Sequence, residues 1–258
     1  MDLSHHNPTG RFSGLADTYA KHRPGYPAAA LDYIVQSCDL DGRSRLVDVG
    51  CGTGISSRLF AARGLAVVGI DPNDEMRARA AAEPIVAALP VPEYRKGTAE
   101  ATGLPDGFAD AVLAAQAFHW FKADAALREF HRVLRPGGHV ALMWNERDEH
   151  DDCTAAYGKV MRWGPEAAAL EGQRGSAGEA LLHHPLFVDA TRVVFSNEQP
   201  LDEEGLLGRA FSASYAPREE AARARFAAAL RQVFADYQQA GRVVLRYETS
   251  VYVGRRKD

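Results

Sequence analysis

The segment from Leu46 to Met76, LVDVGCGTGISSRLFAARGLAVVGIDPNDEM, joins an apolar strand to a helix through three closely spaced glycines. A second apolar strand follows this helix and ends at Asp71. Two strands joined by a helical crossover lie parallel in one sheet. The segment therefore predicts an α/β fold in which helices cover both faces of a parallel sheet.

The hydrophobic pattern extends this arrangement along the chain. Continuous or alternating apolar runs predict strands, and a period near 3.6 residues predicts the helices between most of them. Strands that alternate with helices form a doubly wound sheet. The predicted strands are 45–49, 66–70, 93–96, 109–115, 139–144, one within 186–199 and one within 242–256, and the predicted helices are 55–63, 74–82, 124–134 and a long one that ends at Gly241.

The length and the hydrophobic content suit one domain. The 258 residues, 46% of them hydrophobic, can bury the core of a single α/β domain with a modest cap. Residues 151–178 are rich in Ala, Gly and Glu, so we expect a mobile connection or a cap over the sheet edge. The expected divisions are an N-terminal arm at 1–27, a core at 28–150, a cap and substrate region at 151–215, and a C-terminal helix and strand at 216–258.

Charge and cysteine content exclude several classes of protein. Lys and Arg total 30 against 34 Asp and Glu, so we expect neither nucleic acid nor a membrane as a partner. The three cysteines are far apart and lack C-x-x-C spacing, which argues against disulfides and a zinc site. The polar N-terminus and the lack of a long apolar run predict a cytoplasmic protein.

The spacing of the glycines limits the classes of ligand that the turn is expected to bind. Gly50 to Gly54 have the pattern G-x-G-x-G, whereas a dinucleotide site prefers G-x-G-x-x-G, and Ile55 stands where its third glycine would be. Asp48 would repel a pyrophosphate but could hold the ammonium group of an amino-acid-like ligand. A carboxylate at the second strand end, here Asp71, can accept hydrogen bonds from both ribose hydroxyls.

Together these residues resemble the signature of class I S-adenosylmethionine-dependent methyltransferases, over about the first 145 residues. The motifs VDVGCGTG and GIDPNDEM are followed, in the order of that superfamily, by KGTAEATGLPDGFADAV, LAAQAFHWF and EFHRVLRPGGHVALMWN. The AFHWF segment and the arm RFSGLADTYAKHRPGYP are similar to methyltransferase type 11 proteins of the trans-aconitate methyltransferase-like branch. The resemblance implies a Rossmann-like, doubly wound sheet of seven strands, mostly parallel with an antiparallel final strand, and a small helical cap.

The resemblance also implies a site. Its cofactor would be S-adenosyl-L-methionine, released as S-adenosyl-L-homocysteine after in-line transfer of the methyl group to a small-molecule acceptor. We take His119 as the candidate catalytic base. The cofactor-binding residues implied are Tyr19, Arg23, Asp48, Gly50, Cys51, Gly52, Gly54, Asp71, Pro72, Met76, Thr98, Ala99, Glu100, Gln116 and Ala117, and the acceptor-side residues are Tyr26, His119, Trp120 and Trp144.

The N-terminal arm is expected to close over the cofactor. Gly10 and Gly14 give it freedom, Phe12 is an aromatic anchor, and the stiff RPGYP segment leads into the first helix. Arg23 suits bidentate recognition of a carboxylate, although it could instead pair with a surface acid. We therefore expect a lid whose order depends on the cofactor.

Several alternatives stay open. The aromatic residues of the arm could be core anchors, and His119 could be a buried structural histidine. His183 and His184 lack partners at metal-ligand spacing, so no metal is expected. A non-catalytic cofactor-binding regulatory protein shares every cofactor motif, and a nicotinamide-dependent oxidoreductase is disfavoured by the glycine spacing.

The acceptor itself is also open. A carboxylate needs no base, whereas a phenol, an amine or a carbon acid could use His119, His22 or a tyrosine. The strand end AQAFHWF lacks the Asn/Asp-Pro-Pro-aromatic motif of methyltransferases that act on nucleic-acid bases. This favours a small molecule, with a carboxylate or a hydroxyl as the first candidates, and a monomer and a homodimer fit equally well.

Overall fold

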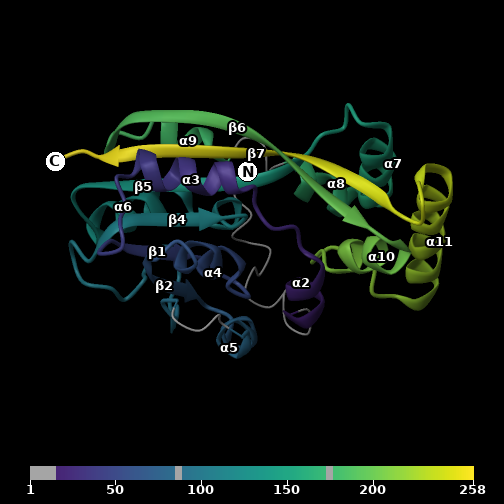
Figure 1. Cartoon of the computed structure of the whole chain (residues 1–258), viewed down its shortest axis with the longest axis horizontal. Coiled ribbons are helices and arrows are strands. Elements are labelled where there is room, and N and C mark those ends of the chain that lie inside the picture. The colour runs from purple at the N-terminus through teal and green to yellow at the C-terminus, as the bar shows by residue number, and fades with distance from the viewer. Residues whose placement is uncertain (1–15, 85–88, 173–176) are drawn as a thin grey trace.

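The computed structural model describes residues 16–84, 89–172 and 177–258. Its strands are β1 (Arg45–Val49), β2 (Ala66–Asp71), β3 (Glu93–Lys96), β4 (Ala109–Ala115), β5 (Leu134–Arg147), β6 (Phe187–Leu201) and β7 (Val243–Arg256). They form one sheet in the order β3-β2-β1-β4-β5-β7-β6 (Figure 1). β1 to β5 pair in parallel, and β7 runs antiparallel to both β5 and β6. The expected seven-stranded, mostly parallel sheet with an antiparallel final strand is confirmed.

Helices lie on both faces of this sheet, as the alternating pattern predicts. The described helices are α2 (Ala16–His22), α3 (Ala28–Ser37), α4 (Ile55–Ala61), α5 (Asp74–Ala82), the 3₁₀ turn η2 (Phe118–Trp120), α6 (Ala123–Val133), α7 (Asp152–Met161), α8 (Pro165–Gly172), α9 (Glu179–Leu182), α10 (Glu203–Phe211) and α11 (Glu220–Tyr237). On one face, Ile34 of α3 and Phe60 of α4 are buried in a common cluster. On the other, Phe130 of α6 and Leu181 of α9 are buried.

A third apolar cluster builds a cap beyond the sheet. It joins Tyr157 of α7, Leu206 of α10 and Leu230 of α11 to Leu245 of β7. The first residues of β7 pair with β6 alone, because β5 ends at Arg147, opposite Tyr247. Figure 1 shows the β6–β7 pair running past the other strands toward α10 and α11. The region 151–215 therefore holds cap helices and also the edge strand β6.

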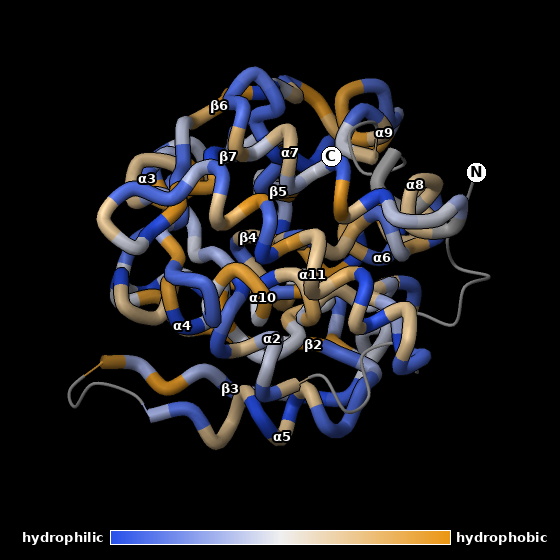
Figure 2. Tube along the Cα trace, turned by 90° about the vertical axis from the view of Figure 1, so that its right-hand side faces the viewer, coloured by the Kyte–Doolittle hydropathy of each residue, from blue (hydrophilic) through white to orange (hydrophobic). Residues whose placement is uncertain are grey.

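The cap lies at the edge of the sheet where the parallel strands end. Figure 2 looks at the molecule from this side, with α10 and α11 in front of the strands and α2 next to α10. Contacts between α2 and α10 and between α10 and α11 agree with this view. Asp151 begins the cap as the N-cap of α7, where its side chain accepts a hydrogen bond from the Thr154 amide.

Helix α4 ends at Ala61 instead of residue 63, α6 spans Ala123–Val133 instead of 124–134, and the largest difference is at the C-terminal helix. The long C-terminal helix ends at Tyr237 instead of Gly241. Gln238 has extended backbone, and Gln239 and Arg242 form a short bridge around Gly241, whose φ is 77°. Gly241 therefore makes the turn into β7, and the helix stops before it because the bridge takes the next backbone groups.

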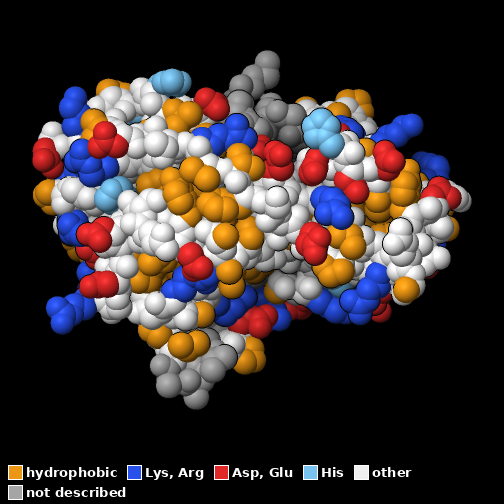
Figure 3. All heavy atoms as spheres, turned by 45° about the horizontal axis from the view of Figure 1, so that its top comes forward, with side chains coloured by type: hydrophobic (Ala, Val, Ile, Leu, Met, Phe, Trp, Pro, Cys, Tyr) orange, Lys and Arg blue, Asp and Glu red, His pale blue; other side chains and the backbone are white. Residues whose placement is uncertain are grey.

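Four observations bear on membrane insertion, metal binding, disulfides and nucleic-acid binding. No helix in the described ranges has the length and apolarity to cross a membrane. Among the same residues, no group of three or more His, Cys, Asp or Glu side chains could hold a metal ion. Cys38, Cys51 and Cys153 are free and buried. On the face shown in Figure 3, acidic and basic side chains are interspersed and do not gather by sign.

Candidate active site

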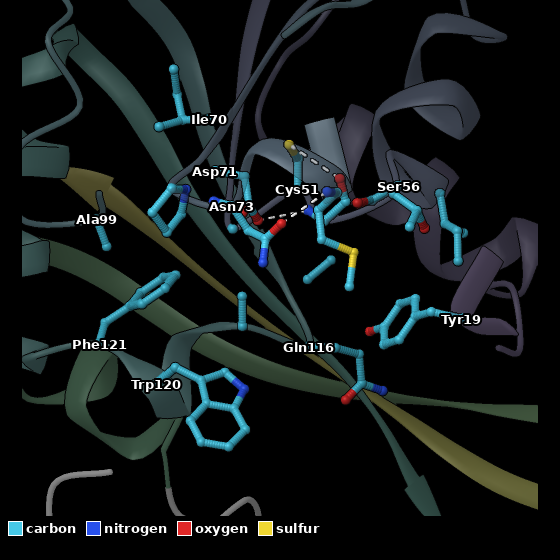
Figure 4. Close-up of a pocket in the computed structure, with 18 of the residues that line it drawn as sticks. Tyr19, Cys51, Ser56, Ile70, Asp71, Asn73, Ala99, Gln116, Trp120 and Phe121 are labelled. Carbon is cyan, nitrogen blue, oxygen red and sulfur yellow. Dashed lines mark hydrogen bonds between the residues drawn. The ribbon is translucent and has the colours of Figure 1, made fainter. Parts of the chain in front are cut away.

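A cavity of about 440 Å³ lies at the carboxyl ends of the parallel strands. β1 lies between β2 and β4, so the strand order reverses at this point, which is where open α/β sheets bind ligands. The volume suits a small-molecule site. Figure 4 shows side chains from the strand ends and from the arm converging on it. Its walls come from α2, the glycine turn, the end of β2, residues 97–100, residues 115–122, Asn145 and Arg209.

The glycine turn forms one wall, and Gly50 and Gly52 meet different requirements. Gly50, Gly52 and Gly54 all have positive φ, at 71°, 53° and 74°. A Cβ at Gly50 would lie 2.6 Å from the Cβ of Ala117, so this position is needed for close packing. A Cβ at Gly52 would meet nothing within 4 Å, and Gly52 lines the cavity. Open space on a backbone turn allows a ligand to approach closely.

Asp71 ends β2 on the cavity wall. Its carboxylate accepts hydrogen bonds from the amides of Gly52 at 2.9 Å and Asn73 at 2.8 Å. Burial raises the pKa of this carboxyl, whereas the two amide hydrogen bonds and Arg77 lower it. Each carboxylate oxygen retains a lone pair. A pair of adjacent hydroxyls is therefore a suitable partner for Asp71.

Asp48 lies beneath the wall. It is fully buried, and one oxygen accepts hydrogen bonds from the hydroxyls of Ser56 at 2.7 Å and Ser57 at 2.6 Å. Its other oxygen, Oδ1, has no hydrogen-bond partner among the described residues. Burial raises the pKa of Asp48 to about 6, against the lowering effect of the two serines. The unused oxygen can accept one more hydrogen bond, but it is closed off from the cavity by the residues around it.

Mostly apolar residues line the part of the cavity next to Asp71. Ala99, Met76 and Phe121 are on its walls, together with Pro72 and Thr98. Glu100 also lines the cavity, and its Oε1 accepts a hydrogen bond from the Lys122 amide at 2.9 Å. Apolar walls with a few polar groups at the rim are suited to a nucleobase.

Residues of the arm close the other side. Tyr19, Arg23 and Tyr26 all line the cavity. The Arg23 guanidinium lies 4.5 Å from the centroid of the Tyr19 ring and donates a hydrogen bond to the Ser212 carbonyl at 3.1 Å. In Figure 4, Tyr19 projects into the cavity on the side opposite Phe121. Gly10, Phe12 and Gly14, the other residues proposed for the lid, lie outside the described residues.

In the segment after β4, residues that are neighbours in sequence have different surroundings. Gln116 and Trp120 line the cavity, but the cavity walls given by the described residues do not include His119 or Trp144. The indole nitrogen of Trp144 donates a hydrogen bond to Nδ1 of His119 at 3.2 Å, and both side chains are buried. Trp144 also packs edge-on against Tyr252, with ring centroids 5.8 Å apart. His119 is therefore held between Trp144 and the ring of Trp120, whose centroid is 4.9 Å away, behind the described cavity wall.

Most sequence-derived residues gather at this one cavity. It brings together Tyr19, Arg23, Tyr26, Gly50, Cys51, Gly52, Asp71, Pro72, Met76, Thr98, Ala99, Glu100, Gln116, Ala117 and Trp120. Asp48, Gly54, His119 and Trp144 are not among its described wall residues. Burial raises the pKa of the Cys51 thiol well above its ordinary value, so Cys51 stays neutral.

Other wall residues were not predicted from the sequence. Asn73, Phe121, Lys122 and Asn145 follow recognised strand ends and could have been inferred from their proximity to them. Arg209 could not, because it belongs to α10 in the cap, more than sixty residues after β5. Arg209 reaches the cavity only because the cap helices pack against the end of the sheet.

The comparisons with known proteins lead to methyltransferases. The chain carries a methyltransferase domain: residues 47–142 match the family model described as a methyltransferase domain. An uncharacterized methyltransferase of Mycobacterium tuberculosis is 37% identical over 161 residues, which cover 62% of this chain and 63% of that protein. The matched part of the chain thus spans somewhat under two thirds of the length of these mycobacterial relatives.

Solved structures give the same architecture. A structure described as a type II methyltransferase from Anaeromyxobacter dehalogenans has a TM-score of 0.62 and 26% identity, and the match covers 90% of this chain and 97% of that one. The [4+2]-cyclase SpnF has a TM-score of 0.52 and 19% identity, and the match covers 99% of this chain and 97% of that one. At that identity the likeness to SpnF concerns the fold alone.

Proposed function

We propose that this protein transfers a methyl group from S-adenosylmethionine to a small-molecule acceptor. One observation carries the proposal: the glycine turn, the Asp71 carboxylate and the apolar compartment at Ala99 line a single cavity of about 440 Å³ that also reaches the arm and the cap. A cofactor with a nucleoside at one end and an amino acid at the other fits that order of groups.

The residues present suit the ribose, the adenine and the carboxylate of this cofactor. Asp71 would accept hydrogen bonds from the ribose hydroxyls, because its oxygens retain lone pairs beside the Gly52 and Asn73 bonds. The adenine would lie between Ala99, Met76 and Phe121. Arg23 suits the carboxylate.

The cofactor supplies an electrophilic methyl group. The chain's own contribution is to hold the acceptor in line with that methyl and to keep water out, which can account for roughly 7 to 11 kcal/mol of rate acceleration. Tyr19 and Trp120 close the cavity from the arm and from η2. Because the cavity walls formed by described residues do not include His119, the proposed mechanism needs no proton transfer to it.

Two measurements test the proposal. Calorimetry should detect binding of S-adenosylhomocysteine, and a screen of carboxylic acids, phenols and amines with methyl-labelled cofactor should detect a methylated product. Binding without turnover would favour a regulatory cofactor-binding protein, and thermal stabilisation by NADH alone would favour an oxidoreductase. Turnover must be measured directly, because the fold is shared with a [4+2]-cyclase.

A further inference from the structure

Arg209 is a buried cation without a described counter-ion. Its side chain is only 5% exposed, and it lines the cavity. Within the described ranges it forms no ion pair with any carboxylate, and its Nε has no hydrogen-bond partner. An arginine removed from water without a counter-ion is strongly destabilising for the empty protein. Such a group is retained where a ligand supplies the missing charge.

The surroundings of Arg209 belong to the cap. Its electrostatic partners are the hydroxyl groups of Tyr157, Tyr215 and Tyr247, from α7, the loop after α10, and β7. Of the three, Tyr247 is hydrogen-bonded to the guanidinium, and neutral hydroxyls do not neutralise its charge. α10 itself lies between α2 and α11, away from the glycine turn (Figure 1). Arg209 therefore faces the cavity from the wall that the cap supplies.

Charges along the cavity are unevenly distributed. Asp71, Glu100 and Lys122 line the part assigned to the ribose and the base, whereas Arg23 and Arg209 line the part next to the arm and the cap, where the cavity has no acidic wall residue among those described. Arg23 is directed to the Ser212 carbonyl and the Tyr19 ring, so the two guanidinium groups have different partners. One cofactor carboxylate would need only one of them.

From this geometry we infer that the methyl acceptor carries a carboxylate and that Arg209 binds it. The inference rests on the proposed function and names the substrate class of the same site. A guanidinium suits a carboxylate because it offers parallel N–H donors and remains charged in a dry site. Arg209 is thus a specificity residue of the acceptor side, and the carboxylate is the group by which the acceptor is recognised.

Binding of matched acids and amides tests the inference. The probes are benzoate, cinnamate and succinate, each paired with its neutral amide, added to protein saturated with S-adenosylhomocysteine. At least one acid should raise the melting temperature when its amide does not. Arg209→Gln should weaken binding of that acid at least tenfold and change the affinity for S-adenosylhomocysteine less than twofold. Arg209→Lys should retain part of the acid binding.

A stability measurement separates ligand recognition from a structural role. Arg209→Met removes a charge that lacks a described counter-ion, so the ligand-free variant should melt at or above the temperature of the parent. A structural arginine would give the opposite result. Arg231→Gln is the matched control, because Arg231 lies on the neighbouring α11 and pairs with Glu203 at the surface. This control should bind the acids as the parent does.

Every outcome decides the inference. It is overturned when no acid binds better than its amide, or when Arg209→Gln binds the acids unchanged. Loss of S-adenosylhomocysteine affinity in Arg209→Gln, with acid binding intact, would assign the guanidinium to the cofactor's own carboxylate. Failure of the parent to bind S-adenosylhomocysteine contradicts the proposed function instead, and acid binding in the Arg209 variants can then still be compared without cofactor.

Discussion

Trp144 donates its indole N–H to Nδ1 of His119, at a distance of 3.2 Å. An indole nitrogen is only a donor, so Nδ1 must be the acceptor and a neutral ring carries its proton on Nε2. In that form the remaining ring nitrogen cannot take a proton from an acceptor. The geometry therefore favours a positioning role for His119 over the role of a general base.

Replacing His119 tests this role. His119→Asn keeps an acceptor for Trp144 and should retain kcat within about tenfold of the parent. His119→Ala leaves a buried donor unpaired and should lower the free energy of unfolding by about 1 to 3 kcal/mol. Denaturant titration and steady-state kinetics measure the two effects. A folded His119→Asn protein with a thousandfold lower kcat would restore His119 as the base.

Asp71 is expected to determine cofactor affinity. Asp71→Asn removes the charge from hydrogen bonds to the ribose, which should cost roughly 1.5 to 3 kcal/mol of binding free energy. Calorimetry with S-adenosylhomocysteine measures this loss. Asp74→Asn is the control, because Asp74 is exposed and pairs with Arg77 at the surface. Equal affinities for the two variants would contradict the assignment of Asp71.

Changing Gly52 and Gly50 to alanine should affect different properties, cofactor binding in the first case and thermal stability in the second. Gly52→Ala has free space around its Cβ, so it should lose only roughly 1 to 2 kcal/mol of stability for its positive φ. Its methyl group would enter the cavity and weaken cofactor binding. Gly50→Ala has the same backbone strain and also a clash with Ala117, so it should unfold at lower temperature than Gly52→Ala. The reverse order of melting temperatures would refute this reading of the turn.

Asp48 should make the free energy of unfolding larger at acidic pH than at neutral pH. Its pKa is raised by burial from 3.8 to about 6, so the folded state keeps its proton while the unfolded state has lost it. This contribution is complete below pH 3.8 and is lost as pH rises to about 6, a difference of about 3 kcal/mol.

The variant Asp48→Asn removes this pH dependence and leaves an acceptor for Ser56 and Ser57. The free energy of unfolding of Asp48→Asn, relative to the parent, should therefore increase between pH 4 and pH 7. Asp41→Asn provides a comparison of opposite sign, because backbone and side-chain hydrogen bonds lower the pKa of the exposed Asp41. A relative stability of Asp48→Asn that is flat with pH would show that the carboxyl is ionised throughout.

The arm should become more ordered when cofactor binds. α2 has no buried residue, and it is held to its neighbours by surface ion pairs such as Lys21 with Glu204. Such pairs contribute little stability, so the amides of residues 16–23 should exchange rapidly in the empty protein and more slowly with S-adenosylhomocysteine. The buried helix α3 serves as the internal reference. Identical exchange of α2 in both states would show an ordinary packed helix.

The sequence predicts the cofactor half of the site well because that half depends on local chemistry. A strand end, a glycine turn and a carboxylate keep their relation in any βαβ unit, so Gly52 and Asp71 lie where their spacing requires. His119 and Trp120 show the limit of this reasoning. They are neighbours on a 3₁₀ turn, yet only Trp120 lines the cavity, since successive residues on so tight a turn point in different directions.

Arg209 could not be predicted for a different reason. Its position depends on where α10 packs, which depends in turn on the length of β6 and on the tyrosines of α7 and β7. These are contacts between residues far apart in the chain. Hydrophobic periodicity identifies a helix of this kind, but it does not specify which cavity one polar side chain on that helix will reach.

The cap is connected to the sheet through the long β6–β7 pair. The cap can therefore vary while the part of the site around the glycine turn stays the same. Leu201 at the end of β6 pairs with Val243 at the start of β7, and α10 and α11 lie between these two residues in the chain. A small alteration of twist or length there would swing the whole cap over a glycine turn that stays fixed. Loop grafts made at this junction could therefore exchange acceptor preference between relatives, while the nucleotide-like half of the binding site is inherited intact.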